Sequence, residues 1–481
     1  MDSAMYRHTK IIATLGPAVA DAESVDAMVG AGMDVARLNF SHGDHDLHRT
    51  FAGWVRDAAK RHGKSVAIVQ DIQGPKLRVG TFPEGQVHLS AGSAVELSPS
   101  SGEGNENVIP CGYASLLDDV QPGDRVVLAD GLITLKVHSI DSDTATAEVV
   151  QGGELSDHKG VAFPDSELSV ETITEKDERD LEFGKTLGVE YVAASFVRNG
   201  EDVSRVRELA DDVPIIAKIE LAQAYENLDS ILDQAEAIMV ARGDLGVQLP
   251  LQRLPLIQND ILKRSNAAGR ISITATEMLE SMIQSPRPTR AEVTDVANAV
   301  FGGTDAVMLS GETAIGSYPI KAIEAMALIC LDTEQGTLSL RGSHPVPFVG
   351  DGNTVASAVA QAATEIAVNV DAKMIVAFTE SGNTARLISK YRPEVAINAF
   401  TPNPATERQM ALMWGVLPHP LDRRVYTDEE ISTASRYLES QGLANRGDRV
   451  VMVAGVPPGV RASTNLVKVH EIGEDSGGMG S

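Results

Sequence analysis

A lysine and two carboxylates stand close together near the middle of the chain. Lys218 and Glu220 are two residues apart at the end of an apolar run, and Asp244 follows Gly243 after the next run. Residues two apart in a strand point to the same face. Two carboxylates with water suit a hard cation such as Mg²⁺ or Mn²⁺, while a lysine stabilises negative charge that develops nearby. The pattern predicts metal-assisted phosphoryl transfer, with a structural Lys–Glu ion pair as the alternative.

Groups that could bind phosphate occur at similar places. The segment Gly243–Gly246 precedes a helix-like stretch, where free backbone N–H groups can meet an anion, although such a segment alone is more often a plain turn. Arg37 and Arg78 are candidate phosphate clamps, because a guanidinium group matches phosphate oxygens, or they are surface arginines. His42, which follows Ser41, is a candidate substrate contact or a neutral structural histidine.

Short apolar runs alternate with amphipathic helical stretches through much of the chain. This alternation favours right-handed βαβ units, and eight runs favour closure into a (β/α)8 TIM barrel, which is an α/β fold. Catalytic side chains of such barrels lie at the C-terminal ends of the strands, where most of the polar residues above are found. The expected strands are Lys10–Leu15, Val35–Phe40, Val66–Ile72, Tyr191–Val197, Pro214–Glu220, Ala237–Ala241, Ser272–Ala275 and Ala306–Leu309.

Two shifts in composition divide the chain. After Gly74 the pattern becomes all-β, with Gly, Ser, Asp and Pro turns, which predicts a small β-barrel inserted in a loop of the larger barrel. The Gly- and Pro-rich segment Thr337–Thr354 predicts a linker, after which α/β alternation restarts. The predicted division is 1–74 and 166–345 for the barrel domain, 75–165 for the insertion, 346–474 for a C-terminal α/β regulatory domain and 475–481 for a tail.

The composition argues against several classes of partner. The formal net charge of −26 leaves no basic field for nucleic acid or an anionic membrane surface. Cys111 and Cys330 stand far apart in no metal-ligand spacing, so a disulfide framework is not expected. The N-terminal residues lack the apolar core of a signal peptide, and no run of about 18 apolar residues occurs. We therefore expect a cytoplasmic protein that does not enter a membrane.

Several longer segments carry specific motifs. They are Thr9–Pro17 (TKIIATLGP), Gly32–Gly43 (GMDVARLNFSHG), Ile216–Glu220 (IAKIE), Met239–Gly246 (MVARGDLG), Thr276–Met282 (TEMLESM) and the long Pro286–Ala314. Together they resemble the pyruvate kinase family, and the resemblance runs from about residue 9 to residue 472. It implies transfer of the phosphoryl group of phosphoenolpyruvate to ADP, the last step of glycolysis, with Mg²⁺ or Mn²⁺ as the metal. Another phosphoenolpyruvate- or oxoacid-using barrel, or a catalytically dead homologue that binds effectors, is the alternative.

The resemblance assigns roles to the candidate residues. It implies that Glu220 and Asp244 bind the divalent cation, and that Lys218 stabilises the transferring phosphoryl group and the enolate. Arg37 is implied to contact the substrate phosphate. Thr276 is implied to lie near the methylene carbon that is protonated after transfer, in a proton relay with water.

The resemblance extends to the carboxylate and nucleotide sides of the site. It implies that Gly243 and Asp244 offer backbone N–H groups to the substrate carboxylate. Arg78, His42 and Lys159 match nucleotide-binding positions, and Lys159 comes from the insertion. That domain would then act as a lid that closes over the site and excludes water.

One position departs from the common pattern of the family. Many members carry an acidic residue where this chain has Lys76, and they require K⁺, so the chain resembles the K⁺-independent branch. A tethered ammonium group can supply the positive charge that K⁺ would bring. Asn39, Ser41, Asp71 and Ile72 still match the monovalent-cation pocket, so its occupancy stays open. Activity without added K⁺ is expected.

A loop of the C-terminal domain resembles the site where the family binds phosphorylated effectors. The segment Thr379–Thr384 lies between a strand-like and a helix-like run, which suits a phosphate, with a capped helix start as the alternative. Glu380 would repel a second phosphate, which favours a monophosphate such as AMP or a hexose phosphate. The resemblance also implies a homotetramer. The candidate effector ligands are Thr379, Ser381, Gly382, Asn383 and Thr384.

Overall fold

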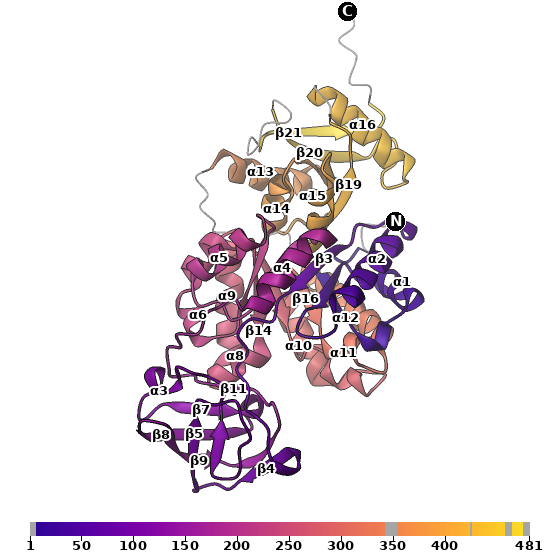
Figure 1. The fold of residues 1–481 in the computed structure, drawn as a ribbon. Coiled ribbons are helices and arrows are strands. Elements are labelled where there is room, and N and C mark those ends of the chain that lie inside the picture. Colours follow the sequence, from indigo (N-terminus) through magenta and orange to yellow (C-terminus); the bar gives the residue numbers. More distant parts are fainter. Residues whose placement is uncertain (1–5, 342–353, 424–425, 457–463, 475–481) are drawn as a thin grey trace, which may run out of the picture.

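Three bodies lie in a row in the computed structural model, which describes residues 6–341, 354–423, 426–456 and 464–474 (Figure 1). The large barrel occupies the middle, the all-β insertion lies below it and the C-terminal domain lies above it in this view. The two ends of the barrel therefore face different neighbours. None of the described helices is long and apolar enough to cross a membrane.

Eight parallel strands form the predicted barrel. They are β1 Lys10–Leu15, β2 Val35–Asn39, β3 Ala67–Asp71, β12 Tyr191–Ala194, β13 Ile215–Ile219, β14 Ala237–Ala241, β15 Ile271–Ala275 and β16 Ala306–Leu309. The hydrogen-bonded order is β1-β16-β15-β14-β13-β12-β3-β2, and the last strand pairs with the first. Almost every strand residue is buried, because helices cover the outer face and side chains fill the interior. The TIM barrel predicted from the alternation is confirmed.

Local capping signals start several of the surrounding helices. Asp44 accepts the N–H of Leu47 at the start of the second barrel helix. Thr174 with Asp177 forms a capping box at the start of the fourth helix of the chain. The helices of this domain are α1 Ala22–Ala31, α2 His45–Arg61, α4 Glu175–Leu187, α5 Gly200–Leu209, α6 Ala222–Glu226, α7 Leu228–Gln234, α8 Arg242–Gln248, α9 Leu254–Ala267, α10 Arg290–Phe301, α11 Gly311–Ala314 and α12 Pro319–Arg341.

The insertion is all-β apart from the short helix α3 Leu116–Asp119. Its strands are β4 Gln86–Leu89, β5 Ala94–Ser98, β6 Val108–Pro110, β7 Arg125–Leu128, β8 Ile133–Ile140, β9 Ala145–Gln151, β10 Gly153–Ser156 and β11 Val161–Ala162. Hydrogen bonds divide them into a six-stranded sheet, β11-β7-β8-β9-β5-β6, and a two-stranded sheet of β10 and β4. Both sheets contribute to one hydrophobic cluster, in which Leu89 and Leu155 meet Leu97 and Ile133.

The C-terminal domain is built on a five-stranded sheet in the order β19-β18-β17-β20-β21. The strands are β17 Met374–Phe378, β18 Ile397–Thr401, β19 Val416–Pro420, β20 Arg449–Gly455 and β21 Thr464–Glu471, and only β21 is antiparallel to its neighbour. The described helices are α13 Val355–Asn369, α14 Asn383–Lys390, α15 Pro404–Gln409 and α16 Thr427–Ser440. The predicted α/β alternation is confirmed.

The linker was placed too early. Helix α12 continues through Arg341, so the segment predicted as Thr337–Thr354 begins inside a helix. The reason is that residues 337–341 contain neither glycine nor proline, and the single Gly336 is tolerated within the helix. Residues 342–353 lie outside the described residues, as does the predicted tail 475–481, and Thr354 caps α13.

The barrel interior and the C-terminal domain share one hydrophobic cluster. Val35 and Ile273 contribute from the barrel strands, and Ile388 and Met410 contribute from the C-terminal domain. A second cluster lies between the strands and the barrel helices and is separate from it. The C-terminal domain therefore covers the N-terminal ends of the strands, which we call the base of the barrel.

A carboxylate stands directly before every second barrel strand at this base. Asp34 precedes β2, Glu190 precedes β12, Glu236 precedes β14 and Asp305 precedes β16, and we call these four the base carboxylates. Each donates its own N–H to the carbonyl of one residue in the preceding strand and accepts that residue's N–H on its carboxylate. The accepted N–H groups belong to Ile11 (2.9 Å), Ile68 (2.7 Å), Ile215 (2.8 Å) and Ser272 (2.7 Å).

Each base carboxylate also has a basic partner. The pairs are Asp34 with Arg7 (2.8 Å) and Lys64 (2.9 Å), Glu190 with Arg56 (2.8 Å) and Arg408 (2.5 Å), Glu236 with Arg207 (2.8 Å), and Asp305 with Lys390 (2.7 Å) and Arg392 (2.9 Å). Burial opposes the charges of Asp34 and Asp305, but these cations outweigh it and lower the pKa of both carboxyl groups. Glu190 and Asp305 take partners from the C-terminal domain.

Candidate active site

Lys218 lies at the centre of a polar cluster at the opposite end of the barrel. Its ammonium group is 2.8 Å from Glu220 Oε1 and 3.3 Å from Asp71 Oδ1, and it donates to Ser195 Oγ at 2.8 Å. Lys218 lies in β13, Glu220 follows that strand, Asp71 ends β3 and Ser195 follows β12. The side chains of both carboxylates are only 2% exposed, so the charges interact through little water.

Burial opposes every charge in this cluster, and the neighbours decide the outcome. For Lys218, Asp71 and Glu220 outweigh burial and raise the pKa of the ammonium group. For Asp71, Arg37 and Lys218 outweigh burial and lower the pKa of the carboxyl group. For Glu220, burial and then the nearby carboxylate of Asp244 raise the pKa, against the effect of Lys218. Glu220 and Asp244 are therefore two like charges whose repulsion a divalent cation would relieve.

The two carboxylates fit a hard cation that takes its remaining ligands from water and substrate. Glu220 and Asp244 supply carboxylate oxygens, and the N–H of Phe196 donates to Glu220 Oε2 at 2.7 Å and orients it. Within the described residues no group of three or more His, Cys, Asp or Glu side chains could hold a metal ion. Two carboxylates leave the other positions to water and substrate oxygens, as is usual for Mg²⁺ that acts on phosphates.

Arg37 reaches the same cluster from the neighbouring strand. Its Nε donates to Asp71 Oδ2 at 2.6 Å, and its Nη1 donates to Thr14 Oγ1 at 3.0 Å. Because β1, β2 and β3 are adjacent, Thr14 and Asp71 hold the guanidinium group from both sides. Asp71 thus orients Arg37 and Lys218 together, which is an arrangement suited to a phosphate.

Thr276 lies in a turn of unusual backbone conformation after β15. Thr276 and Glu277 have φ values of 69° and 53°, a region that side chains other than glycine rarely adopt. The Thr276 hydroxyl accepts the N–H of Gly243 at 2.8 Å. A substrate carboxylate bound at the Gly243 N–H, as the family resemblance implies, would have to displace this hydroxyl.

Three residues that shape the site were not singled out from the sequence. Arg242 is buried, and it donates to the carbonyl of Thr276 at 2.6 Å and to Asp295 Oδ2 at 2.5 Å, so it fixes the strained turn. Ser195 and Phe196 contact Lys218 and Glu220 directly. The signal that could have identified them is their position, since each is among the first residues after a barrel strand, where site residues of such barrels lie.

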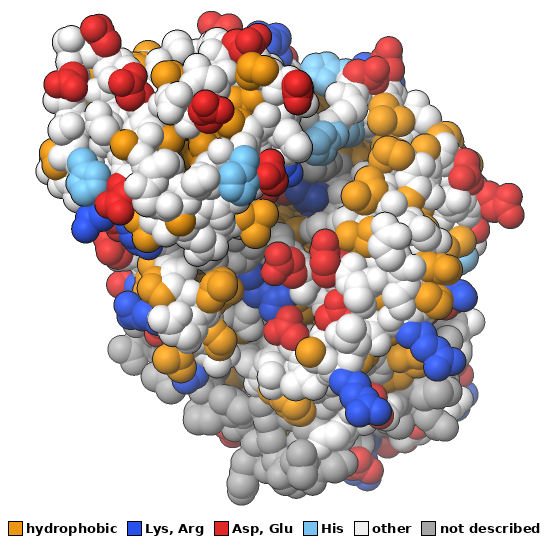
Figure 2. Space-filling model, turned by 90° about the horizontal axis from the view of Figure 1, so that it is seen from below, with side chains coloured by type: hydrophobic (Ala, Val, Ile, Leu, Met, Phe, Trp, Pro, Cys, Tyr) orange, Lys and Arg blue, Asp and Glu red, His pale blue; other side chains and the backbone are white. Residues whose placement is uncertain are grey.

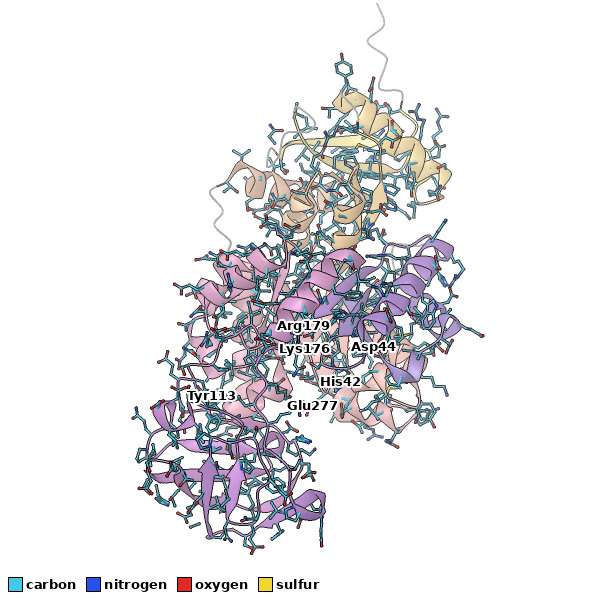
Figure 3. All side chains as sticks on the ribbon, in the orientation of Figure 1. His42, Asp44, Tyr113, Lys176, Arg179 and Glu277 are labelled. Carbon is cyan, nitrogen blue, oxygen red and sulfur yellow. The ribbon has the colours of Figure 1, made fainter. Side chains whose placement is uncertain are left out.

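The predicted nucleotide-side residues lie on both bodies that border the site. His42 is exposed on the end of the barrel that faces the insertion, as is Glu277 (Figure 3). Arg78 and Lys159 are exposed on the insertion, where Arg78 donates to the carbonyl of His158 at 2.9 Å. Acidic and basic side chains gather around a hollow on this face of the molecule (Figure 2).

Lys76 lies where the insertion leaves the barrel and reaches towards Asp244, one of the predicted metal ligands. Its Nζ is 3.9 Å from Asp244 Oδ1, and both side chains are about one-third exposed. Asn39 Oδ1 accepts the N–H of Ser41 at 3.2 Å, and Asp71 is bound to the cations described above. Within the part of the chain that the structure describes, no hydrogen bond or ion pair joins Lys76 to Asn39, Ser41 or Asp71. Replacement of K⁺ by the Lys76 ammonium group stays a prediction.

The predicted effector loop connects β17 to α14. Gly382 has a φ of 81° at the start of the helix, where glycine is favoured. Thr384 Oγ1 is buried 2.7 Å from Thr464 Oγ1, and Asn383 Oδ1 accepts from Arg386 at 2.6 Å. Ser381 is exposed. These contacts leave Ser381 as the side chain of the loop that is most open to a ligand.

The charge beside this loop is negative. Glu380 pairs with Arg423 at 2.7 Å, and the side chain of Arg423 is 65% exposed. Burial, and then the carboxylate of Glu380, raises the pKa of Glu430 to about 7. Arg423 therefore does not cancel the field of Glu380.

Comparison with known proteins gives a consistent result along the chain. The family model described as pyruvate kinase, barrel domain, matches residues 6–323, and the model described as pyruvate kinase, alpha/beta domain, matches residues 357–470. A pyruvate kinase of Geobacillus stearothermophilus is 44% identical over 98% of this chain and 81% of its own length. A pyruvate kinase of Mycobacterium tuberculosis is 42% identical over 98% of this chain and 100% of its own length.

A solved structure agrees with these relatives. The crystal structure of a pyruvate kinase from Cryptosporidium parvum superimposes with a TM-score of 0.89 at 37% sequence identity. The match covers 98% of this chain and 97% of that chain. Barrel, insertion and C-terminal domain are therefore all included in the similarity.

Proposed function

The chain belongs to the pyruvate kinase family, and we propose that Lys218, Glu220 and Asp244 carry its transfer of the phosphoryl group from phosphoenolpyruvate to ADP. The supporting observation is that a buried lysine and two mutually repelling carboxylates meet at the open end of the barrel. In the reaction the bond between phosphorus and the enol oxygen breaks, and a bond to a β-phosphate oxygen of ADP forms. The enolate then takes a proton at its methylene carbon and becomes pyruvate.

The cations of the site act on the charges of the substrate. Members of the family use Mg²⁺, which Glu220 and Asp244 would hold in this chain and which would act there as a Lewis acid on the substrate. Lys218 stabilises the negative charge that passes to the enolate oxygen, since its raised pKa keeps the ammonium group protonated. Arg37 holds a phosphate oxygen in the orientation set by Asp71.

Proton delivery is assigned to the strained turn. Thr276 Oγ1 accepts the Gly243 N–H at 2.8 Å and donates to the carbonyl of Ala275 at 2.7 Å. When the substrate carboxylate takes the Gly243 N–H, the released hydroxyl passes a proton from water to the methylene carbon. Arg242 keeps the turn in place but has no contact with reacting atoms in this scheme.

The nucleotide is assigned to the space between barrel and insertion. His42 contributes from the barrel, and Arg78 and Lys159 contribute from the insertion, which makes the insertion (residues 75–165) the lid of the site. Closure would bring the two cations of the insertion to the phosphates of ADP and exclude water from the transfer.

Replacing Lys218 with Met tests the assignment. We expect kcat to fall at least ~1000-fold, about 4 kcal/mol of transition-state stabilisation, in a coupled assay of pyruvate formation. Lys64→Met is the matched control, because Lys64 also pairs with a buried carboxylate but at the base of the barrel. It should lower the melting temperature and change kcat by less than about twofold. A Lys218→Met enzyme that keeps more than about a tenth of kcat would refute the proposal.

We also propose that the loop Thr379–Thr384 binds a phosphorylated effector. The negative charge of Glu380, still felt by Glu430, favours a monophosphate such as AMP or a hexose phosphate over a bisphosphate. Titration of these compounds at subsaturating phosphoenolpyruvate measures the effect. The absence of any response to AMP, hexose monophosphates and fructose bisphosphate would contradict it.

Two further proposals follow from membership in the family, and a third follows from the departure at Lys76. The protein works in the cytoplasm, it assembles as a homotetramer, and it needs no K⁺ because Lys76 supplies a positive charge near the substrate. Light scattering of the purified protein at assay concentration tests the assembly, and a monomer would contradict it.

A further inference from the structure

The C-terminal domain contacts β12, a strand whose far end lies beside Lys218 of the neighbouring strand β13. Arg408 of α15 pairs with the base carboxylate Glu190 at 2.5 Å. The hydroxyl of Tyr191, the next residue, donates to the carbonyl of Gln409 in the same helix at 2.9 Å. Glu190 is 1% exposed and is held in place by the N–H of Ile68 as well. The first residues of β12 are thus fixed partly by the C-terminal domain.

The far end of the same strand contacts the catalytic groups. β12 is only four residues long, Tyr191–Ala194. The next residue, Ser195, accepts from Lys218 at 2.8 Å and donates to the carbonyl of Ile72 at 2.7 Å. A displacement of β12 along its axis would move Ser195 against Lys218, because a short extended strand is stiff along its length.

Phe196 extends the contact to the metal ligand. Its N–H donates to Glu220 Oε2 at 2.7 Å from a backbone with φ of 55°. Such a conformation is held by its surroundings and changes when they move. The position of β12 therefore affects the orientation of the Glu220 carboxylate as well as that of Lys218.

On the other side, α15 is joined to the loop between β17 and α14. Thr406 Oγ1 donates to the carbonyl of Glu380 at 3.2 Å. The Cα of Gly382 lies close enough that an added Cβ would meet the side chains of Met413 at 3.1 Å and Met410 at 3.4 Å, which directly follow α15. A ligand that moves this loop would move α15 with it.

We propose that Glu190 is a positioning residue for the phosphoryl-transfer site and that the Arg408–Glu190 ion pair transmits the position of α15 to Lys218 and Glu220 through β12. The proposal rests on the roles assigned above to Lys218 and Glu220. It adds that the C-terminal domain acts on the metal site through this strand, with or without a bound effector. The contacts that carry it run without a gap from Glu380 to Glu220.

The other base carboxylates show why this one is singled out. Asp34 and Glu236 have partners only from the barrel domain among the described residues. Asp305 pairs with Lys390 and Arg392 of the C-terminal domain, but β16 leads to Glu312, which accepts the N–H groups of Leu279 and Ser310 and stabilises loops. Among the four base carboxylates, within the described residues, only Glu190 both pairs with the C-terminal domain and begins a strand whose end contacts Lys218 directly.

Replacing Arg408 with Met tests the proposal in the full-length protein. We expect Mn²⁺, measured by electron paramagnetic resonance, to bind about 3- to 10-fold more weakly, and kcat to fall by a similar factor. Arg56→Met is the matched control, because Arg56 also pairs with Glu190, at 2.8 Å, but belongs to the barrel helix α2. It should lower the melting temperature and leave Mn²⁺ affinity unchanged. Arg408→Lys should restore most of the Mn²⁺ affinity.

Two results would overturn the proposal. One is a folded Arg408→Met protein with wild-type Mn²⁺ affinity and kcat. The other is an equal loss in Arg408→Met and Arg56→Met, which would mean that Glu190 only stabilises the fold. The roles of Lys218 and Glu220 are judged separately by Lys218→Met, since that variant leaves α15 and Glu190 untouched. Response to AMP is a separate readout: if wild type responds, Arg408→Met should lose most of the response and Arg56→Met should keep it.

Discussion

The two ends of the barrel use the same groups in opposite ways. At the base, each buried carboxylate has a backbone N–H and at least one cation, and Asp34 and Asp305 have a lowered pKa. At the other end, Glu220 has a raised pKa because it is buried and lies near Asp244. Both ends place Asp or Glu beside Lys or Arg in a site with little water, and Glu220 also has a backbone N–H and the cation of Lys218. The difference at the catalytic end is the second carboxylate, Asp244, which repels Glu220.

The difference separates stability from function. A buried carboxylate whose partners are all within the protein stabilises a position and has no use for a ligand. A pair of carboxylates that repel each other in the absence of metal pays a cost in stability that a divalent cation removes. Matching of charge within the fold, and not the presence of charged residues, distinguishes the structural end from the catalytic end.

The largest expected effect is at the base. Asp305→Asn would leave the ammonium group of Lys390, which is 1% exposed, without its carboxylate, and we expect the free energy of unfolding to fall by about 3–5 kcal/mol. Urea denaturation measures it. Glu236→Gln is the control, since this side chain is 36% exposed and has one cation, and it should cost about 1 kcal/mol. Equal losses of unfolding free energy in the two variants would show that the burial and the number of cation partners of a base carboxylate do not determine its contribution to stability.

A smaller effect is expected where the insertion meets the catalytic end. Lys76 lies 3.9 Å from Asp244, so Lys76→Glu replaces an attraction by a repulsion at this proposed metal ligand. We expect activity in a Na⁺- and K⁺-depleted assay to fall about 10-fold, or about 1.4 kcal/mol, and to recover when K⁺ is added. The wild-type enzyme should be active without K⁺, and strong activation of wild type by K⁺ would contradict the prediction.

The smallest effect concerns the stability of the metal-free protein. The pKa of Glu220 is raised in the folded state, so folding is favoured at a pH where this carboxyl group is protonated. The free energy of unfolding therefore falls as the pH rises from the ordinary pKa of a glutamate through the raised pKa of Glu220. Asp244→Asn removes one cause of the shift, so we expect the free energy of unfolding at pH 8 to rise by about 0.5–1 kcal/mol, with no change near pH 4. Urea denaturation with a chelator at both pH values measures this. A loss of stability at pH 8 would show that the two carboxylates do not repel.

Much of the fold was accessible from the sequence. The β1 and β14 boundaries agree with the apolar runs Lys10–Leu15 and Ala237–Ala241, because a buried parallel strand must be apolar on both faces. The spacing of Lys218 and Glu220 predicted their contact for the same geometric reason. The end of α12 was misjudged, because the polar residues before Gly342 do not themselves break a helix.

The sequence could not reveal contacts between distant segments. Arg408 and Glu190 are 218 positions apart, and nothing local marks either as a partner of the other. The acid before every second strand was a visible signal at Asp34, Glu190 and Asp305, but its meaning requires the hydrogen bond to the preceding strand. Likewise, the strain at Thr276 depends on Arg242, which is set by the packing of two neighbouring strands.

The regular placement of the base carboxylates divides the barrel into quarters. Each quarter consists of an odd strand and the even strand whose leading carboxylate clasps it, beginning with β1 and β2 and ending with β15 and β16. A chain break between β2 and β3 would leave every clasp within one fragment, whereas a break between β1 and β2 would separate Asp34 from Ile11. The molecule is in this sense assembled from clasped strand pairs, and the joints between pairs are the places where the chain can be cut without separating a clasp. The insertion lies within the β3–β12 pair, but it leaves and returns at the opposite end of the strands and so does not disturb the clasp of Glu190.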